Sequence, residues 1–200
     1  MEQNTEELIR QAARKVFTEK GLTGARMQDI ADEAGINRAL LHYYFRSKEK
    51  LFELVFDEAF TRFLGTVQPI IYAHIPFFEK IEQLVEAEMD LVESQPCNPL
   101  FILNEMKQNP AICEKKNLYK LYTPFLEQLS VLLQEEHKAG RIIKIEGEQL
   151  FLNIISLILF PFIAREYVQH AFGMEESEYR KMMQRRKKEI ARFVIQAIRA

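Results

Sequence analysis

The chain has 200 residues, which is enough for one large domain or for a small module joined to a medium-sized one. Hydrophobic residues make up 48% of it and charged residues 28%, with only seven Gly and seven Pro, so the composition excludes disordered and fibrous proteins. The net charge of −2 does not exclude a nucleic-acid partner, because an acidic remainder can cancel a local positive patch in the total.

The N-terminal residues and the cysteines both indicate a cytoplasmic protein. The stretch before the first predicted helix lacks the apolar core of a signal peptide. Cys97 and Cys113 are too few for a disulfide framework or a Cys-based zinc site, which fits a reducing compartment. We therefore expect cytoplasmic localisation.

Three short helices are predicted within the first fifty residues. Apolar residues recur at helical spacing from about residue 5 until Gly21 ends the first helix. The second helix covers about residues 27–34 and stops at Gly35, and the third covers about residues 37–45.

From Ser47 onward the pattern predicts longer helices and no strand of convincing length. Gly and Pro residues divide this part of the chain. The predicted segments are a connecting helix that begins at Ser47, followed by helices near residues 76–94, 99–108, 115–138, 146–170 and 175–199. We therefore predict an all-α fold of about nine helices.

Residues 150–164 form a notably apolar segment. Asn153, Ser156 and Pro161 interrupt it, and its uncharged run is shorter than the ~20 residues that cross a bilayer. We expect a buried helix here and no membrane partner.

Residues 28–49 have the pattern of a helix-turn-helix. Its first helix must pack closely on the second across a tight turn, which requires small residues and one that tolerates a positive φ. Ala31, Ala34 and Gly35 supply these. The second helix would then lie in the major groove, with Leu41 on its inward face.

A local excess of positive charge accompanies this pattern. Residues 36–50 contain four Lys or Arg side chains and only one carboxylate, that of Glu49. Such an excess attracts the phosphates of DNA. The pattern and the charge together predict DNA binding.

The same stretch resembles the N-terminal pattern of the TetR family of bacterial regulators. The matching groups are Asp29-Ile30-Ala31, Ala34-Gly35-Ile36, Leu41, Tyr43-Tyr44-Phe45 and Ser47-Lys48-Glu49, with Phe17 and Lys20-Gly21 upstream. The resemblance implies a three-helix DNA-binding domain at residues 1–48 and a helical ligand-binding and dimerisation domain at residues 49–200.

The resemblance also implies which residues contact DNA. They are Gln28, Asn37, Arg38, Ala39, Leu40, His42, Tyr43, Tyr44 and Lys48. Arg38 is the residue best suited to a bidentate contact with guanine, and Lys48 resembles the family's phosphate-binding lysine.

Several positions depart from the family pattern. Ala25 and Arg26 replace the usual Thr-Ser before the second helix, while Leu40 and His42 replace a frequent Thr and a common Tyr. These changes leave an alternative open, in which the chain is a helical metabolite-binding or protein-binding module with lost or weakened operator recognition.

A homodimer is a further implication of the resemblance, with the helices near 146–170 and 175–199 of each subunit forming its interface. The interface candidates are Ile155, Leu159, Phe162, Ile163, Ile190 and Phe193. Ordinary core packing is the alternative for these residues. We interpret the basic residues 185–188 as a solvated helix face.

The resemblance and the composition predict an apolar cavity for a small apolar or amphipathic ligand, which would release a repressor from a pseudo-palindromic operator. The pocket candidates are Phe78, Met89, Phe101, Met106, Tyr122, Phe125 and Phe160. Glu82, Glu86 and Glu88 could meet a cationic ligand, although exposed carboxylates are the more common outcome.

Enzymatic function finds no support in the sequence. No His has a Glu three residues before it, and there is no P-loop, Gly-x-Gly-x-x-Gly or Gly-x-Ser-x-Gly motif. We predict a protein that is not an enzyme and that has no cofactor and no metal.

Overall fold

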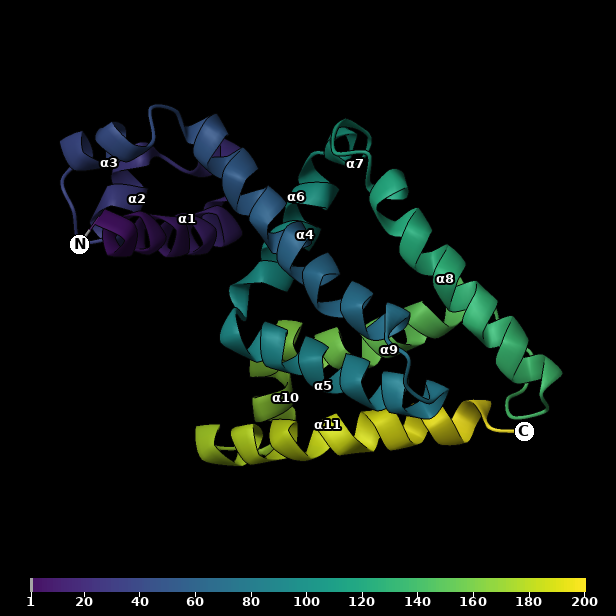
Figure 1. Cartoon of the computed structure of the whole chain (residues 1–200). Helices are drawn as coiled ribbons and strands as arrows, with labels where there is room; N and C mark the ends of the chain where they lie inside the picture. Colours follow the sequence, from purple (N-terminus) through teal and green to yellow (C-terminus); the bar gives the residue numbers. More distant parts are fainter. Residues whose placement is uncertain (1) are drawn as a thin grey trace. The chain divides into compact units, whose positions relative to one another are not determined.

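The protein is all helical in the computed structural model, which describes residues 2–200 except for the side chains of residues 2–4 and Cys97 (Figure 1). The helices are α1 (Glu2–Gly24), α2 (Met27–Glu33), α3 (Arg38–Tyr44), α4 (Lys48–Tyr72), α5 (Phe77–Ser94), α6 (Cys97–Gln108), α7 (Ala111–Lys115), α8 (Leu118–Lys138), α9 (Gly147–Ile163), α10 (Arg165–Phe172) and α11 (Glu176–Ile198). Over the described residues no strand forms, and Ile142 and Arg199 make an isolated antiparallel bridge. The all-α prediction is confirmed.

Eleven helices cover the described residues, where the sequence predicts about nine. The short helix α7 follows Pro110 and was not predicted separately. The helix expected at residues 146–170 is divided into α9 and α10, whose axes are bent by 74°. No single described helix is long and apolar enough to cross a bilayer, and this bent pair meets the criterion only by combined length and composition.

Pro161 lies in the last turn of α9, just before the helix is divided from α10 at Ala164. Proline has no N–H to donate to the carbonyl four residues earlier, so the Leu157 carbonyl loses its helical partner. The Arg186 guanidinium of α11 donates to that carbonyl at 2.9 Å. The Tyr179 hydroxyl, also of α11, donates to the Pro161 carbonyl at 2.9 Å. Two side chains of α11 therefore satisfy the backbone at this joint.

The helices form two compact units. One contains the residues up to Arg62 together with Gln95–Lys116, and the other contains Phe63–Ser94 and Asn117–Ala200. These units are defined by how compactly their residues pack. The boundary expected after residue 48 instead separates a DNA-binding domain from a ligand-binding and dimerisation domain, and it stays a prediction.

A cluster of four Phe side chains forms the centre of the first unit. Phe17 of α1 meets Phe52 of α4 edge to face, with ring centroids 5.1 Å apart. Phe101 of α6 lies 5.4 Å from Phe52 and 5.9 Å from Phe56 by ring centroids. All four are buried, so aromatic packing holds the start of α4 against α1 and α6.

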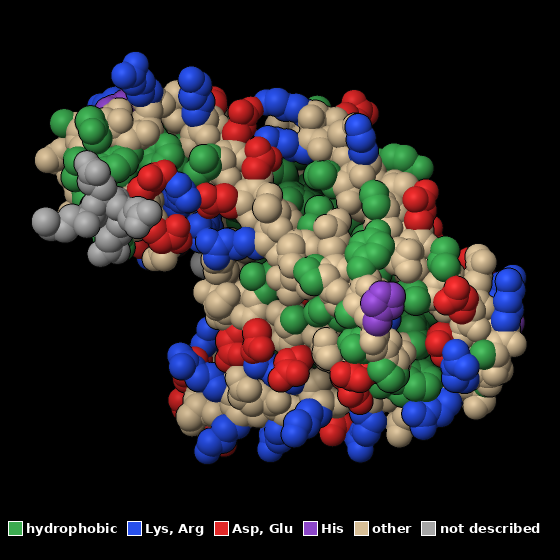
Figure 2. Space-filling model, in the orientation of Figure 1, with side chains coloured by type: hydrophobic (Ala, Val, Ile, Leu, Met, Phe, Trp, Pro, Cys, Tyr) green, Lys and Arg blue, Asp and Glu red, His purple; other side chains and the backbone are tan. Residues whose placement is uncertain are grey.

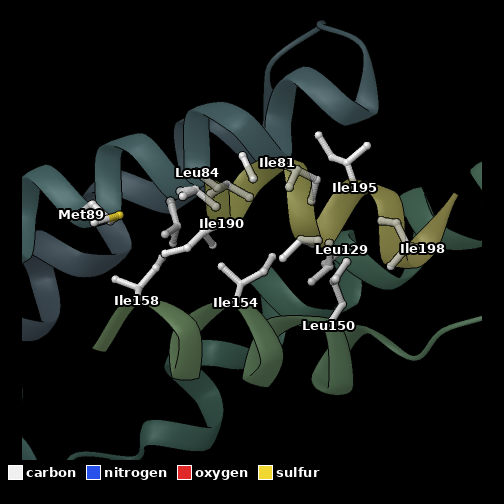
Figure 3. Packing of buried hydrophobic residues seen from close by; sticks show 14 of the residues in the cluster. Ile81, Leu84, Met89, Leu129, Leu150, Ile154, Ile158, Ile190, Ile195 and Ile198 are labelled. Carbon is white, nitrogen blue, oxygen red and sulfur yellow. The ribbon is translucent and has the colours of Figure 1, made fainter. Parts of the chain in front are cut away.

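The core of the second unit is made chiefly of aliphatic side chains from α5, α8, α9 and α11. Figure 3 shows Ile81 and Leu84 of α5 facing Ile154 of α9, with Ile190 and Ile195 of α11 beside them. These helices supply apolar stripes at the helical spacing, and each stripe is covered by the others. This core surrounds the candidate ligand site described below.

Candidate nucleic-acid interface and ligand cavity

The turn of the predicted helix-turn-helix is built around Gly35. Its φ is +65°, a backbone conformation that suits glycine. The N–H of Ile36 donates to the Ala31 carbonyl at 3.0 Å, and the N–H of Gly35 donates to the Asp32 carbonyl at 3.1 Å. This pattern of hydrogen bonds ends α2 and turns the chain toward α3.

The start and the inward face of α3 are fixed by two residues. The Asn37 side chain accepts a hydrogen bond from the backbone N–H of Leu40 at 2.8 Å and so caps the helix. Leu41 is 0% exposed and anchors α3 in the core of the first unit. The opposite face of α3 is therefore held toward solvent.

Four of the predicted DNA-contact residues lie on that solvent face. Arg38, Ala39, Leu40 and Tyr43 are all exposed, and Tyr43 reaches 73% exposure. The Tyr43 ring packs edge to face on Tyr44 with centroids 5.3 Å apart, which limits its movement. An exposed arginine, small and apolar side chains, and a tyrosine together provide groups that can contact base edges.

Arg38 is oriented by its neighbour one turn along the helix. Its Nε donates to Nε2 of His42 at 3.3 Å. The two terminal nitrogens of a guanidinium can make a bidentate contact with guanine. The hydrogen bond from Nε leaves these two nitrogens of Arg38 available for such a contact.

Two other predicted contact residues are already hydrogen bonded within the unit. The Gln28 amide donates to Asp32 at 2.7 Å on the exposed side of α2. The Lys48 ammonium donates to the Ala25 carbonyl at 2.9 Å and thereby links the start of α4 to the residues before α2. An ammonium has three donors, so Lys48 can also bind phosphate.

Three further cations near the helix-turn-helix are not among the predicted contact residues. Arg26, Arg46 and Lys50 are exposed, at the N-terminal cap of α2 and on either side of the start of α4. Figure 2 shows Lys and Arg side chains along the edge formed by α3 and the start of α4. Local charge counting was the signal that could have identified them.

Ion pairs hold α2 against α1. Asp29 pairs with Lys20 at 3.0 Å and accepts a hydrogen bond from the Arg26 backbone N–H at 2.9 Å. The hydrogen bond from Lys20, followed by that from Arg26, lowers the pKa of the Asp29 carboxyl. A charged Asp29 at this position helps to fix the first helix of the motif.

The predicted dimer-interface residues occupy different environments. Ile155, Leu159, Phe162 and Ile163 of α9 are half-buried, and Phe193 of α11 is 62% exposed. Ile190 is 3% exposed and belongs to the core of the second unit. Leu152 and Phe160 of α9 are also more than half exposed, and sequence periodicity alone did not separate them from core.

The seven pocket candidates are divided between the two units. Phe101 and Met106 belong to the first unit, whereas the other five belong to the second. Within the second unit Met89 is buried in the core, Phe78 lines a surface groove of about 700 Å³ between α5 and α11, and Phe160 is exposed. Their assignment to a ligand pocket stays a prediction.

Phe125 lines a small cavity inside the second unit. Its volume is about 20 Å³. The lining residues are Val67, Ile81, Leu84, Glu88, Phe125, Leu129, Phe151, Ile154 and Ile155. Tyr122, another pocket candidate, packs against Phe151 with the two rings tilted and their centroids 6.1 Å apart.

Glu88 is the unexpected member of this lining. Glu82 and Glu86 are exposed, as the sequence favours, but Glu88 is 3% exposed, so exposure was the wrong expectation for it. Burial raises the pKa of its carboxyl to about 8. Burial and the nearby Glu88 charge raise the pKa of Tyr122 to about 12. The sequence contained an indication of this burial, because Glu88 lies on the apolar stripe of α5 between Leu84 and Val92.

Comparisons with known proteins agree with this geometry. A family model described as "Bacterial regulatory proteins, tetR family" matches residues 9–55, and one described as "Tetracyclin repressor-like, C-terminal domain" matches residues 78–194. The probable HTH-type transcriptional regulator YttP of Bacillus subtilis is 24% identical over 182 residues, which cover 89% of this chain and 86% of that protein. The HTH-type transcriptional regulator RutR of Escherichia coli is 24% identical over 147 residues, covering 73% and 68%.

Solved structures show the same fold. The ketosteroid transcriptional regulator KstR2 of Mycobacterium tuberculosis has a TM-score of 0.73 at 16% identity, covering 98% of this chain and 95% of that one. The hemolysin II transcriptional regulator HlyIIR has a TM-score of 0.62 at 25% identity, covering 100% and 99%. Since the C-terminal family model alone spans more than half of the sequence, the chain belongs to the TetR family of bacterial regulatory proteins.

Proposed function

We propose that this TetR-family regulator is a repressor that binds a pseudo-palindromic operator as a homodimer and is released when a small molecule binds its second unit. The observation that carries the DNA-binding part is the solvent face of α3, where Arg38 and Tyr43 are exposed while Leu41 anchors the helix. A recognition helix needs this division between an inward and an outward face. Such a regulator acts in the cytoplasm, where its DNA is.

The homodimer is supported by an apolar surface on α9 and α11. Leu152, Phe160 and Phe193 are exposed by 56%, 59% and 62%. A groove of about 330 Å³ lies beside Phe193, between α9 and α11, and is lined mostly by apolar side chains. Large apolar side chains grouped on a surface favour contact with another protein surface, here that of a second copy.

Operator geometry follows from the twofold symmetry of such a dimer. Each subunit would place its α3 in a major groove, so the half-sites should lie about 10 bp, or a simple multiple of that, apart. Ligand release requires that the ligand bind better to a conformation that does not fit this spacing.

Footprinting with the full-length protein on the DNA upstream of its own gene tests the proposal. The expected result is a protected site with two related half-sites. Arg38→Ala should erase the protection, while Arg185→Ala, a matched change at an exposed arginine of α11, should keep it. Protection that survives Arg38→Ala, or no protection at all, would favour a metabolite-binding or protein-binding module.

A further inference from the structure

Glu88 has a buried carboxyl group to which the fold gives no ion-pair partner among the described residues. Its Oε1 atom is buried and has no hydrogen-bond partner in the described part of the chain. Two other buried charged side chains do have partners: the Lys80 ammonium donates to the Ile71 carbonyl at 2.9 Å, and Arg14 pairs with Glu58 at 3.4 Å. A buried carboxyl without a partner costs stability, so its presence points to a role outside folding.

All the other residues that line the cavity with Glu88 are apolar. α4 contributes Val67, α8 contributes Phe125 and Leu129, and α9 contributes Phe151, Ile154 and Ile155. Figure 3 shows Ile81, Leu84, Leu129 and Ile154 pointing toward one another in this region. About 20 Å³ would admit one water molecule, but buried waters usually make about three hydrogen bonds and this lining offers one polar side chain.

No cation of the described residues pairs with Glu88. The ion pairs of this part of the chain do not include it, and burial is the cause of its raised pKa. Among the titratable groups of the helices packed against it, Tyr122 of α8 responds to its charge, and a tyrosine hydroxyl does not neutralise a carboxylate. The position therefore has a carboxyl group in an apolar environment and no positively charged partner among the described residues.

We propose that Glu88 is the anchor for the effector, and that the effector is a small amine with an apolar body. Its ammonium group would pair with the Glu88 carboxylate, and its body would contact the Phe, Leu and Ile side chains of the cavity. This inference rests on the proposed function, since it names the ligand class of the same regulator.

The small size of the cavity connects binding to a change of conformation. An amine of several carbons exceeds about 20 Å³, so its entry requires side chains of α8 or α9 to move away from α5. An amine that binds only the widened form shifts the population toward that form. Such a shift is what release from an operator requires.

The pairing also moves a proton. Because burial raises the pKa of Glu88 to about 8, the carboxyl holds its proton at neutral pH. When an ammonium group enters, that proton leaves to the solvent and the cavity stays neutral overall. Binding of the amine at neutral pH should therefore release close to one proton for each bound molecule.

Calorimetric titration of the full-length protein tests this inference, with n-hexylamine and the uncharged n-hexanol as probes. The titrations are made near pH 7 in two buffers of different ionisation enthalpy, so that released protons are counted. Glu88→Gln keeps the side-chain volume and removes the charge, and Glu86→Gln is the matched control on the exposed face of the same helix.

We expect n-hexylamine to bind with release of about one proton and Glu88→Gln to weaken that binding at least about tenfold, as for loss of a charged hydrogen bond. Glu86→Gln should bind n-hexylamine as the unmodified protein does. Glu88→Gln should leave the binding of n-hexanol unchanged. The inference is overturned if n-hexylamine does not bind, or if it binds without proton release and equally well to Glu88→Gln.

The two proposals can fail separately. If n-hexylamine binds as expected but the operator complex persists, Glu88 anchors an amine, and the proposal that this binding releases the protein from its operator is wrong. If no operator is bound at all, the proposed function fails, and the titration still decides whether Glu88 anchors an amine.

Discussion

At the scale of single residues, we propose that Arg38 carries the specificity of the DNA interface. Asn37 caps the helix just before it, and His42 holds its Nε, so its position is set before DNA arrives. A guanidinium fixed in this way loses less conformational entropy when it binds.

Arg38→Ala should weaken binding to the operator by about 1–3 kcal/mol, or about 5- to 150-fold, because a bidentate base contact is lost. Fluorescence anisotropy with operator and shuffled DNA measures this. Arg38→Lys keeps the charge and should lose most of the discrimination as well. Equal weakening on both DNAs would show that Arg38 contacts only phosphate.

Lys48 has a different expected role from Arg38. Lys48→Ala should lower the slope of log affinity against log salt by about one unit and leave the preference for the operator unchanged. The measurement is a salt titration of DNA binding. Lys144→Ala, at an exposed lysine of the second unit, should leave the slope as it is. An unchanged slope in Lys48→Ala would mean that its ammonium serves only the Ala25 carbonyl.

At the scale of helices, the joint between α9 and α10 shows why one sequence prediction was wrong. Pro161 was visible in the sequence, but a proline inside an apolar run can either kink a helix or end it. The outcome depends on whether other groups satisfy the freed carbonyls. Arg186 and Tyr179, from a helix many residues later, do so here, and no local pattern could predict those partners.

Tyr179→Phe should lower the free energy of unfolding by about 1–2 kcal/mol, since it leaves the Pro161 carbonyl without its donor in a buried site. Urea unfolding followed by circular dichroism provides the value. Tyr167→Phe removes an equivalent hydroxyl from a side chain that is 67% exposed and should have almost no effect. Similar values for the two variants would contradict the role given to the Tyr179 hydroxyl.

The helix-turn-helix was predictable for the opposite reason. Its determinants are local: Gly35 supplies a positive φ, Asn37 caps α3, and Leu41 follows at a fixed spacing. The proposed ligand site was not predictable, because the burial of Glu88 depends on the packing of α4, α8 and α9 against α5. Sequence periodicity placed Glu88 on the apolar stripe without showing what covers it.

At the scale of the whole molecule, Glu88 should make stability depend on pH. The folded state holds its proton up to about pH 8, whereas the unfolded chain releases it near 4.5. Between these values the folded state binds more protons, so the free energy of unfolding falls as the pH rises, and the full cost is present above about pH 8.

Glu88→Gln should remove this dependence. The stability of the variant relative to the unmodified protein should increase by on the order of 4 kcal/mol between about pH 5 and pH 8.5. Urea unfolding at the two pH values checks this, with Glu86→Gln as the control. If the difference between Glu88→Gln and the unmodified protein does not change with pH, Glu88 is not held in its protonated form.

We propose, above all, that this chain recognises a specific DNA sequence as a dimer through α3. Selection of bound sequences from a random DNA library by the full-length protein tests it most directly. We expect enrichment of an inverted repeat with half-sites about 10 bp, or a multiple of that, apart, and loss of this enrichment in Arg38→Ala. A library that remains random after repeated selection at moderate salt, or a single unrepeated motif, would contradict it.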